Sequence, residues 1–146
     1  MSKVIMGIDP DSKRYGIAIY RNNKLTELLN LNIIELYAHI TNMMKLDDIE
    51  IHLEDVKRSK AVWHAQGMNK SVAAMAAQKV GMCKQSQTCI EQLAENLKIP
   101  VVLHRVSSQW KKGNDKKMFE RITGWQGRSN EETRSAAWFG YQGIRR

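Results

Sequence analysis

The chain has 146 residues, enough for one domain with a full hydrophobic core over residues 1–146, and its 23 Lys and Arg against 15 Asp and Glu give a formal net charge of +8. No apolar run is long enough to span a bilayer and the N-terminus lacks a signal-peptide pattern, so we expect no membrane contact and a cytoplasmic location in the cell that makes the protein. Cys83 and Cys89 lie six positions apart, which suits neither a zinc clip nor a disulfide framework, and we interpret both as thiols in or near the core.

The first predicted strand, Lys3–Pro10, ends in an acid. Its apolar run is typical of a strand buried on both faces, and Asp9 stands where the strand stops. Pro10 has no backbone N–H to donate and therefore ends the strand. A bound divalent cation would compensate the charge of Asp9, although an Asp at a strand end often caps the following turn instead. A second strand is predicted over Tyr15–Tyr20, and a third begins after Lys24.

A second strand-end acid follows in the middle of the chain. A predicted helix over Leu31–Lys45, capped by Asn30 or Asn32, precedes a short strand over Ile49–Leu53 that delivers Glu54. Two strands that end in carboxylates at one edge of a sheet bring like charges together. Such a pair is costly unless a cation bridges it.

A long helix is predicted over about Met68–Leu97, after an irregular basic loop over Val56–His64. Its small residues between Ala73 and Gly81 allow another element to approach closely. We expect this stretch to pack within the domain, with a dimer seam as the alternative. The buried strand Ile99–His104 then completes a parallel strand–helix–strand unit.

Two more helices are predicted at the end of the chain. The first covers Asn114–Ile122 with its first residue as N-cap, and the second covers Ser129–Gly140, capped by its first residue or by Asn130. Glu131 and Glu132 fill the first turn of this last helix, where the helix dipole favours acids for structural reasons alone. The element order β-β-β-α-β-α-β-α-α indicates an α/β fold with a mixed sheet and helices on both faces.

The basic residues are clustered rather than spread evenly. Two of the clusters, residues 57–60 and 111–117, each have a tryptophan close by in the sequence, Trp63 and Trp110. Basic side chains interleaved with aromatic ones are typical of a surface that follows phosphates and stacks on bases. Together with the excess positive charge, this pattern predicts a nucleic-acid partner, whereas solubility alone would not require clustering.

Three acids stand out as candidate metal ligands: Asp9, Glu54 and Glu132. Carboxylate oxygens are the ligands that Mg²⁺ prefers, and two such ions roughly 4 Å apart can activate water and stabilise the leaving oxygen in phosphodiester hydrolysis. No Ser/His/Asp or Cys/His set competes, because the histidines are scattered. No phosphate-binding Gly loop is present, so we expect no nucleotide cofactor.

The opening sequence Gly7-Ile-Asp-Pro-Asp-Ser12, followed by Tyr15-Gly-Ile-Ala18, resembles the first motif of RuvC-type Holliday junction resolvases, members of the RNase H-like superfamily. Ile51–Glu54 is similar to the second motif, an apolar strand that ends in Glu. Ser108-Gln-Trp-Lys-Lys112 resembles a loop of phage-type members. The resemblance covers nearly the whole chain in order, and it implies an RNase H-like fold with a mixed five-stranded sheet.

The chain departs from this family at the final motif. The last Asp of the motif falls on Ser135, while Glu132 lies one helical turn earlier and Glu131 can reach the same side of the helix. A hydroxyl is a weak, neutral ligand, so one metal should bind less tightly. Either Glu132, together with Glu131, replaces the lost acid, or the chain is a weakened or inactive nuclease.

The resemblance implies an endonuclease that resolves four-way or other branched DNA as a homodimer, with two Mg²⁺ ions per site or Mn²⁺ in their place. The implied metal ligands are Asp9, Glu54, Glu132, Ser135 and Glu131, and the implied catalytic lysines are Lys111 and Lys116. The residues we assign to DNA binding are Arg14, Lys57, Arg58, Lys60, Trp63, His64, Trp110, Lys112 and Lys117. Trp63 and His64 stand where family members place a base-probing aromatic residue.

Two alternatives stay open: a junction-binding protein that no longer cuts, and an RNase H-like nuclease for RNA or RNA–DNA hybrids. The short chain is similar to phage members, which would place it in the cytoplasm of the host.

Overall fold

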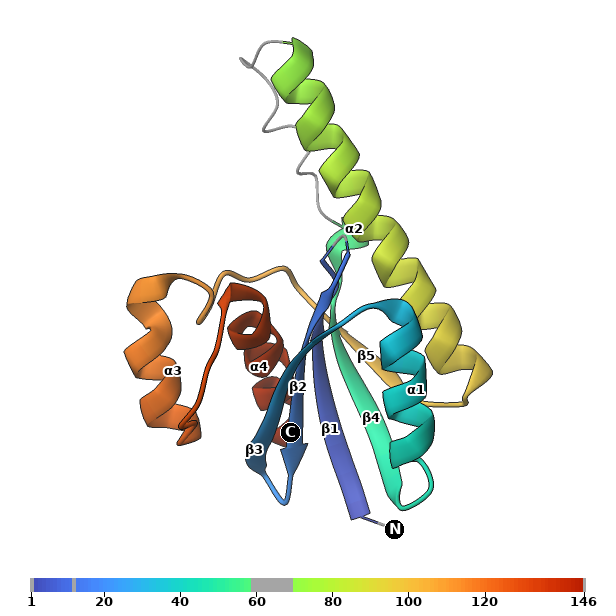
Figure 1. The fold of residues 1–146 in the computed structure, drawn as a ribbon, viewed down its shortest axis with the longest axis vertical. Helices are drawn as coiled ribbons and strands as arrows, with labels where there is room; N and C mark the ends of the chain where they lie inside the picture. The colour runs from blue at the N-terminus through green and yellow to red at the C-terminus, as the bar shows by residue number, and fades with distance from the viewer. Residues whose placement is uncertain (1, 12, 59–69, 146) are drawn as a thin grey trace.

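The computed structural model describes residues 2–11, 13–58 and 70–145 (Figure 1). Five strands form one mixed sheet in the order β3-β2-β1-β4-β5. β1 pairs antiparallel with β2 and parallel with β4, while β2 and β3 are antiparallel and β4 and β5 are parallel. The strands are β1 Ser2–Asp9, β2 Tyr15–Arg21, β3 Lys24–Leu31, β4 Asp47–Glu54 and β5 Val101–His104.

Helices cover both faces of the sheet (Figure 1). On one face lie α1 and α2, and on the other lie α3 and α4. Their bounds are α1 Ile33–Met43, α2 Lys70–Asn96, α3 Lys116–Thr123 and α4 Glu131–Ile144. These findings confirm the predicted α/β class and the mixed five-stranded sheet with helices on both faces.

Two hydrophobic cores form because successive side chains of a strand point to opposite faces of the sheet. Along β1, Val4, Met6 and Ile8 belong to the core under α1 and α2. Ile5 belongs to the other core, which also contains Phe119 from α3 and residues of α4. β1 is therefore buried from both sides over residues 4–9, as its continuous apolar sequence predicts.

The helix starts are partly as predicted. Asn32 caps α1 in a capping box with Glu35, and Asn130 caps α4 in a second box with Thr133. The prediction for α3 is wrong: the helix begins at Lys116, after a short 3-10 turn over Gly113–Asp115, and no side chain caps it. The 3-10 turn takes the place of the cap, since it already uses the first backbone groups of the helix.

The small-residue stretch of α2 does not pack within the described part of the domain, so that expectation is wrong. The buried residues of α2 all lie between Ser86 and Ala94, and the stretch from Ala73 to Gly81 extends past the end of the sheet (Figure 1). Length explains this. A helix of 27 residues is about 40 Å long, whereas an eight-residue strand such as β4 spans about 26 Å. Within the described residues, no helix is long and apolar enough to cross a membrane.

Candidate functional site

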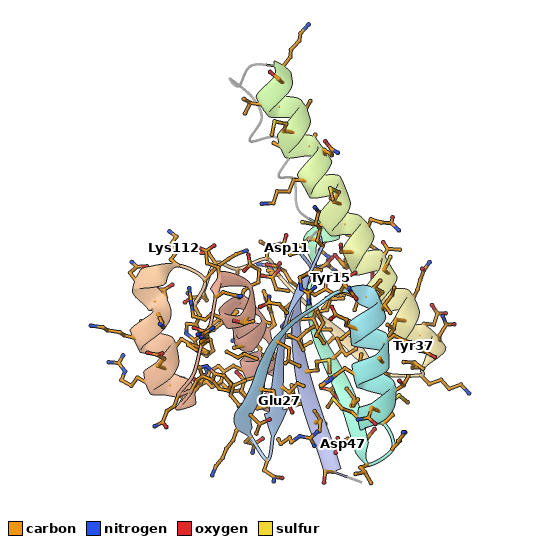
Figure 2. The ribbon with its side chains drawn as sticks, viewed as in Figure 1. Asp11, Tyr15, Glu27, Tyr37, Asp47 and Lys112 are labelled. Carbon is orange, nitrogen blue, oxygen red and sulfur yellow. The ribbon has the colours of Figure 1, made fainter. Side chains whose placement is uncertain are left out.

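The two strand-end acids lie at the same edge of the sheet. β1 and β4 are parallel neighbours with Ile8 opposite Leu53, so Asp9 and Glu54, the next residues, both follow at the same end. Asp9 and Glu54 are each only 4% exposed. They line a pocket of about 320 Å³ at this end of the molecule. Figure 2 shows Asp11, another pocket residue, and Lys112 toward this end, with Glu27 and Asp47 at the opposite one.

The start of α4 adds two further acids to the pocket. Glu131 and Glu132, in the first turn, both line it. The helix can lie this close because Gly16 of β2 faces the Glu132 backbone without a side chain between them. Asp9 is opposite Gly16 in the β1–β2 ladder, so the same contact holds the helix next to Asp9.

Ser135 is fully buried, one turn further along α4. Its Oγ and Oδ2 of Asp9 are buried atoms without a hydrogen-bond partner in the described part of the chain. The Ser135 hydroxyl nevertheless lies close enough to Asp9 to lower the pKa of that carboxyl. Ser135 therefore lies beside Asp9, although it does not itself line the pocket.

Lys111 is the cation that lies beside Asp9. Its Nζ lies 3.6 Å from Asp9 Oδ2, and it lines the same pocket. Burial alone would lower the pKa of Lys111, but the carboxyls of Asp9 and Glu54 and the other acids of the pocket outweigh this and raise the pKa. Lys111 is thus held in its charged form beside the acids.

Burial raises the pKa of both strand-end acids. For Asp9 the main cause is burial, which Lys111 and Ser135 partly offset. For Glu54 burial and the like charge of Asp9 raise the pKa to about 8, again with Lys111 opposing. Two carboxyls in this environment hold a proton between them near neutral pH unless more positive charge is present.

We expect the stability of the protein without a bound cation to fall as the pH rises from about 4.5 to about 8. Folded Glu54 keeps its proton over this range, whereas the unfolded chain releases it above the ordinary pKa of 4.5. The folded state then binds more protons, so the free energy of unfolding decreases with pH. Glu54→Gln, which is neutral at every pH, should flatten most of this decrease. Thermal unfolding in EDTA between about pH 5 and about pH 9 measures it; an equally steep decrease in the variant would contradict the assignment.

The predicted DNA-binding residues lie in different places. Arg14 lines a separate, neighbouring pocket together with Asp11 and Glu132, and it pairs with Glu35 at 3.0 Å. Lys57 pairs with Glu91 at 2.6 Å, and Arg58 pairs with Asp55 at 3.0 Å. None of the six exposed basic residues assigned to DNA binding or catalysis and described by the structure lines the pocket at the strand ends: Arg14, Lys57, Arg58, Lys112, Lys116 and Lys117. The residues that lie outside the described part of the chain are Lys60, Trp63 and His64.

Trp110 is not the exposed stacking residue that we predict from the sequence. Its side chain is 1% exposed and packs against the rings of Phe119, Trp138 and Tyr141, with centroids 5.2 to 5.6 Å away. A buried indole cannot stack on a base. It instead fixes the loop before α3 to the core beneath α4.

Three residues of α2 line the pocket without having been predicted from the sequence: Lys79, Val80 and Cys83. Lys79 and Cys83 both line the pocket, and they are four positions apart, so they share one face of the helix. Burial and the nearby acids Asp11 and Asp9 raise the pKa of the Cys83 thiol, so it stays protonated. The spacing was visible in the sequence, but nothing in it showed that this face turns toward the strand ends.

The donor set suits a hard divalent cation. Within the described residues, no three side chains of His, Cys, Asp or Glu already converge on one point as a complete cage. The pocket nevertheless offers oxygen donors in Glu54, in the two acids of α4 and in Asp9, whose Oδ2 forms no hydrogen bond within the described residues. Mg²⁺ is bound in this way, through few carboxylates and several waters.

Comparisons with known proteins agree with this architecture. No protein-family model matches the chain, and no curated protein matches it. Among solved structures, a T. thermophilus RuvC in complex with a Holliday junction substrate is similar over 97% of this chain and 93% of that chain, with a TM-score of 0.58 and 14% identity. A second structure, of Thermus thermophilus RuvC, is similar over 94% of this chain and 91% of that chain, with a TM-score of 0.58 and 13% identity.

The fold is therefore RNase H-like: a mixed five-stranded sheet flanked by helices, with acids at the ends of its two central parallel strands. Within this class the chain shares the RuvC-type arrangement over nearly its full length. At 13–14% identity this similarity concerns the fold, and the activity has to be argued from the site.

Proposed function

We propose that the protein is a divalent-metal-dependent endonuclease that resolves four-way or other branched DNA junctions. The observation that carries the proposal is the pair of buried acids, Asp9 and Glu54, at adjacent parallel strand ends, with Glu132 and the Lys111 ammonium beside them. The structural similarity to a RuvC bound to a Holliday junction substrate supports branched DNA as the substrate class.

Asp9, Glu54 and Glu132 would hold Mg²⁺ or Mn²⁺, with Glu131 as a further acid and Ser135 as a neutral donor. Two bound ions would supply an activated water and stabilise the leaving oxygen of a phosphodiester. The chain itself contributes the rest. Its two strand ends fix the acids, and burial keeps bulk water away from Asp9.

Lys111 would stabilise the negative charge that develops on the scissile phosphate, because its ammonium already lies among the acids. Lys79, on the α2 side of the pocket, would contact the DNA strand that carries this phosphate. The exposed basic residues would follow the DNA backbone on either side of the site: Arg14, Lys57, Arg58, Lys112, Lys116 and Lys117. The position of Lys116 outside the pocket favours this role over a catalytic one.

A four-way junction is nearly two-fold symmetric, so two equivalent active sites require a homodimer. The part of α2 that extends beyond the sheet offers exposed apolar side chains for such an interface, Val72 and Met75 among them. Sedimentation of the purified protein tests this step independently of cleavage.

The direct test uses a labelled synthetic four-way junction and a linear duplex of the same sequences. Paired nicks across the junction in Mg²⁺ or Mn²⁺ and none in EDTA, with the duplex intact, are the expected result. Cleavage of an RNA–DNA hybrid in preference to the junction would instead identify a different RNase H-like nuclease.

A junction-binding protein that does not cut is the second candidate, and the buried Ser135 beside Asp9 is the observation that favours it. Ser135→Asp distinguishes the two. We expect the wild type to cut and the variant to need several-fold less metal for half-maximal rate, because a carboxylate is a stronger ligand than a hydroxyl.

Because Ser135 has no exposed surface, Ser135→Asn serves as the control for crowding at this position. It adds nearly the same volume without the charge, and thermal unfolding of both variants shows whether they fold. The second candidate would be favoured if the wild type binds junctions without cutting them while Ser135→Asp cuts them.

A further inference from the structure

A buried arginine outside the predicted site holds the loop that carries Lys111. Arg134 is 5% exposed and lies on α4 next to Ser135. Its Nε donates to the carbonyl oxygen of Trp110 at 2.9 Å, and its Nη2 donates to that of Lys111 at 2.9 Å. Nη1 donates to Ser129 Oγ at 3.1 Å. Within the described residues Arg134 forms no ion pair, and two of these three hydrogen bonds go to the backbone of the loop that carries Lys111.

The loop needs such support because its conformation is strained. Trp110 has a φ of +65°, a left-handed value that non-glycine residues seldom adopt and that persists only where the surroundings enforce it. The indole of Trp110 is packed among aromatic rings on one side, and the guanidinium of Arg134 holds its carbonyl on the other. The next residue, Lys111, then projects into the pocket.

We propose that Arg134 is a positioning residue, which fixes the backbone of Trp110 and Lys111 so that the Lys111 ammonium stays beside Asp9. The inference rests on the proposed function for its catalytic consequence. α4 supplies both the acids Glu131 and Glu132 and the guanidinium that sets the lysine. One helix therefore fixes the position of the Lys111 ammonium relative to the acids.

Lysine cannot replace this arrangement, because an ammonium lacks the planar fork that reaches two carbonyls at once. Arg134→Lys keeps the buried charge and loses the paired hydrogen bonds. We expect the single-turnover rate of junction cleavage to fall about ten- to a hundredfold, the range expected when a catalytic group is misplaced by about 1 Å. Junction affinity should stay unchanged, since Arg134 is buried.

A double-mutant cycle with Lys111→Gln separates positioning from general stability. If Arg134 acts through Lys111, Arg134→Lys costs no further activity in the Lys111→Gln background. If the loss of cleavage rate in the double variant equals the product of the two single-variant losses, the proposal is overturned. Arg121→Lys, the same change on the exposed face of α3, is the matched control and should leave the rate unchanged.

A second readout does not depend on cleavage. An amine-reactive reagent, applied without DNA or metal and followed by mass spectrometry, reports how well Lys111 is held in its pocket. We expect labelling of Lys111 to rise several-fold in Arg134→Lys, while labelling of exposed Lys112 in the same sample stays constant. Unchanged labelling of Lys111 would overturn the proposal even if the wild type proves unable to cut.

Ser129→Ala provides a milder variant in case Arg134→Lys does not fold. It removes one acceptor of the fork and leaves the α4 cap, which Asn130 supplies, intact. We expect a smaller rise in Lys111 labelling than in Arg134→Lys. No rise in a folded Ser129→Ala, together with an unfolded Arg134→Lys, would assign Arg134 to stability alone.

Discussion

Asp9→Asn should lower the rate of junction cleavage by at least about a thousandfold, with little change in junction affinity. The amide keeps the shape of the side chain, so the end of β1 and its packing stay in place. It removes the negative charge that would hold a metal at a buried position of the pocket. It also leaves Lys111 without its nearest carboxylate. Single-turnover cleavage and junction binding in Ca²⁺, measured side by side, check the prediction.

Asp48→Asn is the matched control for this change. Asp48 is an exposed acid on β4 at the opposite end of the sheet, and its replacement should leave cleavage unaffected. In EDTA above about pH 8, the melting temperature of Asp9→Asn should be no lower than that of the wild type. Burial disfavours the charged carboxylate of Asp9, and the neutral amide avoids this cost. Substantial cleavage by a folded Asp9→Asn would contradict the assignment of the active site.

The sequence was sufficient to place the acids because their positions depend on local signals. An apolar strand that stops at Asp9-Pro10, and another that stops at Glu54, define two strand ends. A parallel pairing then brings both ends to one edge, and the structure has that pairing. The α/β class follows from the same alternation of elements.

The residues that the sequence misplaced depend on tertiary packing. A tryptophan among lysines is typical of a base-stacking surface, but whether the ring of Trp110 points outward depends on the aromatic residues of α3 and α4. In the same way, the direction in which α2 leaves the sheet decides that Lys79 reaches the pocket and that Ala73 stays outside the core. Arg134 gave no signal in the sequence, because its acceptors, two backbone carbonyls and the Ser129 hydroxyl, are brought to it by tertiary packing and by the turn before α4.

The contact between β1 and α4 supports the second large prediction, that Gly7→Ala destabilises the protein by about 3 kcal/mol or more. A Cβ at Gly7 would overlap the carbonyl oxygen of Ala136 and lie 2.6 Å from the backbone nitrogen of Gly140. Both are backbone atoms of α4, so no side-chain rotation relieves the clash. The helix would have to move away from the sheet, and Glu132 and Ser135 would move with it.

Gly81→Ala is the control, because it makes the same substitution where a Cβ meets nothing within 4 Å. On the exposed part of α2 it should stabilise the protein by up to about 1 kcal/mol, since alanine is the better helix former. Urea unfolding followed by circular dichroism compares both variants with the wild type. If Gly7→Ala unfolds at the same urea concentration as the wild type, α4 does not lie directly on β1. The claim that α4 brings its acids close to Asp9 would then fail too, because Gly7 and Gly16 both face the backbone of α4 in the same packing contact.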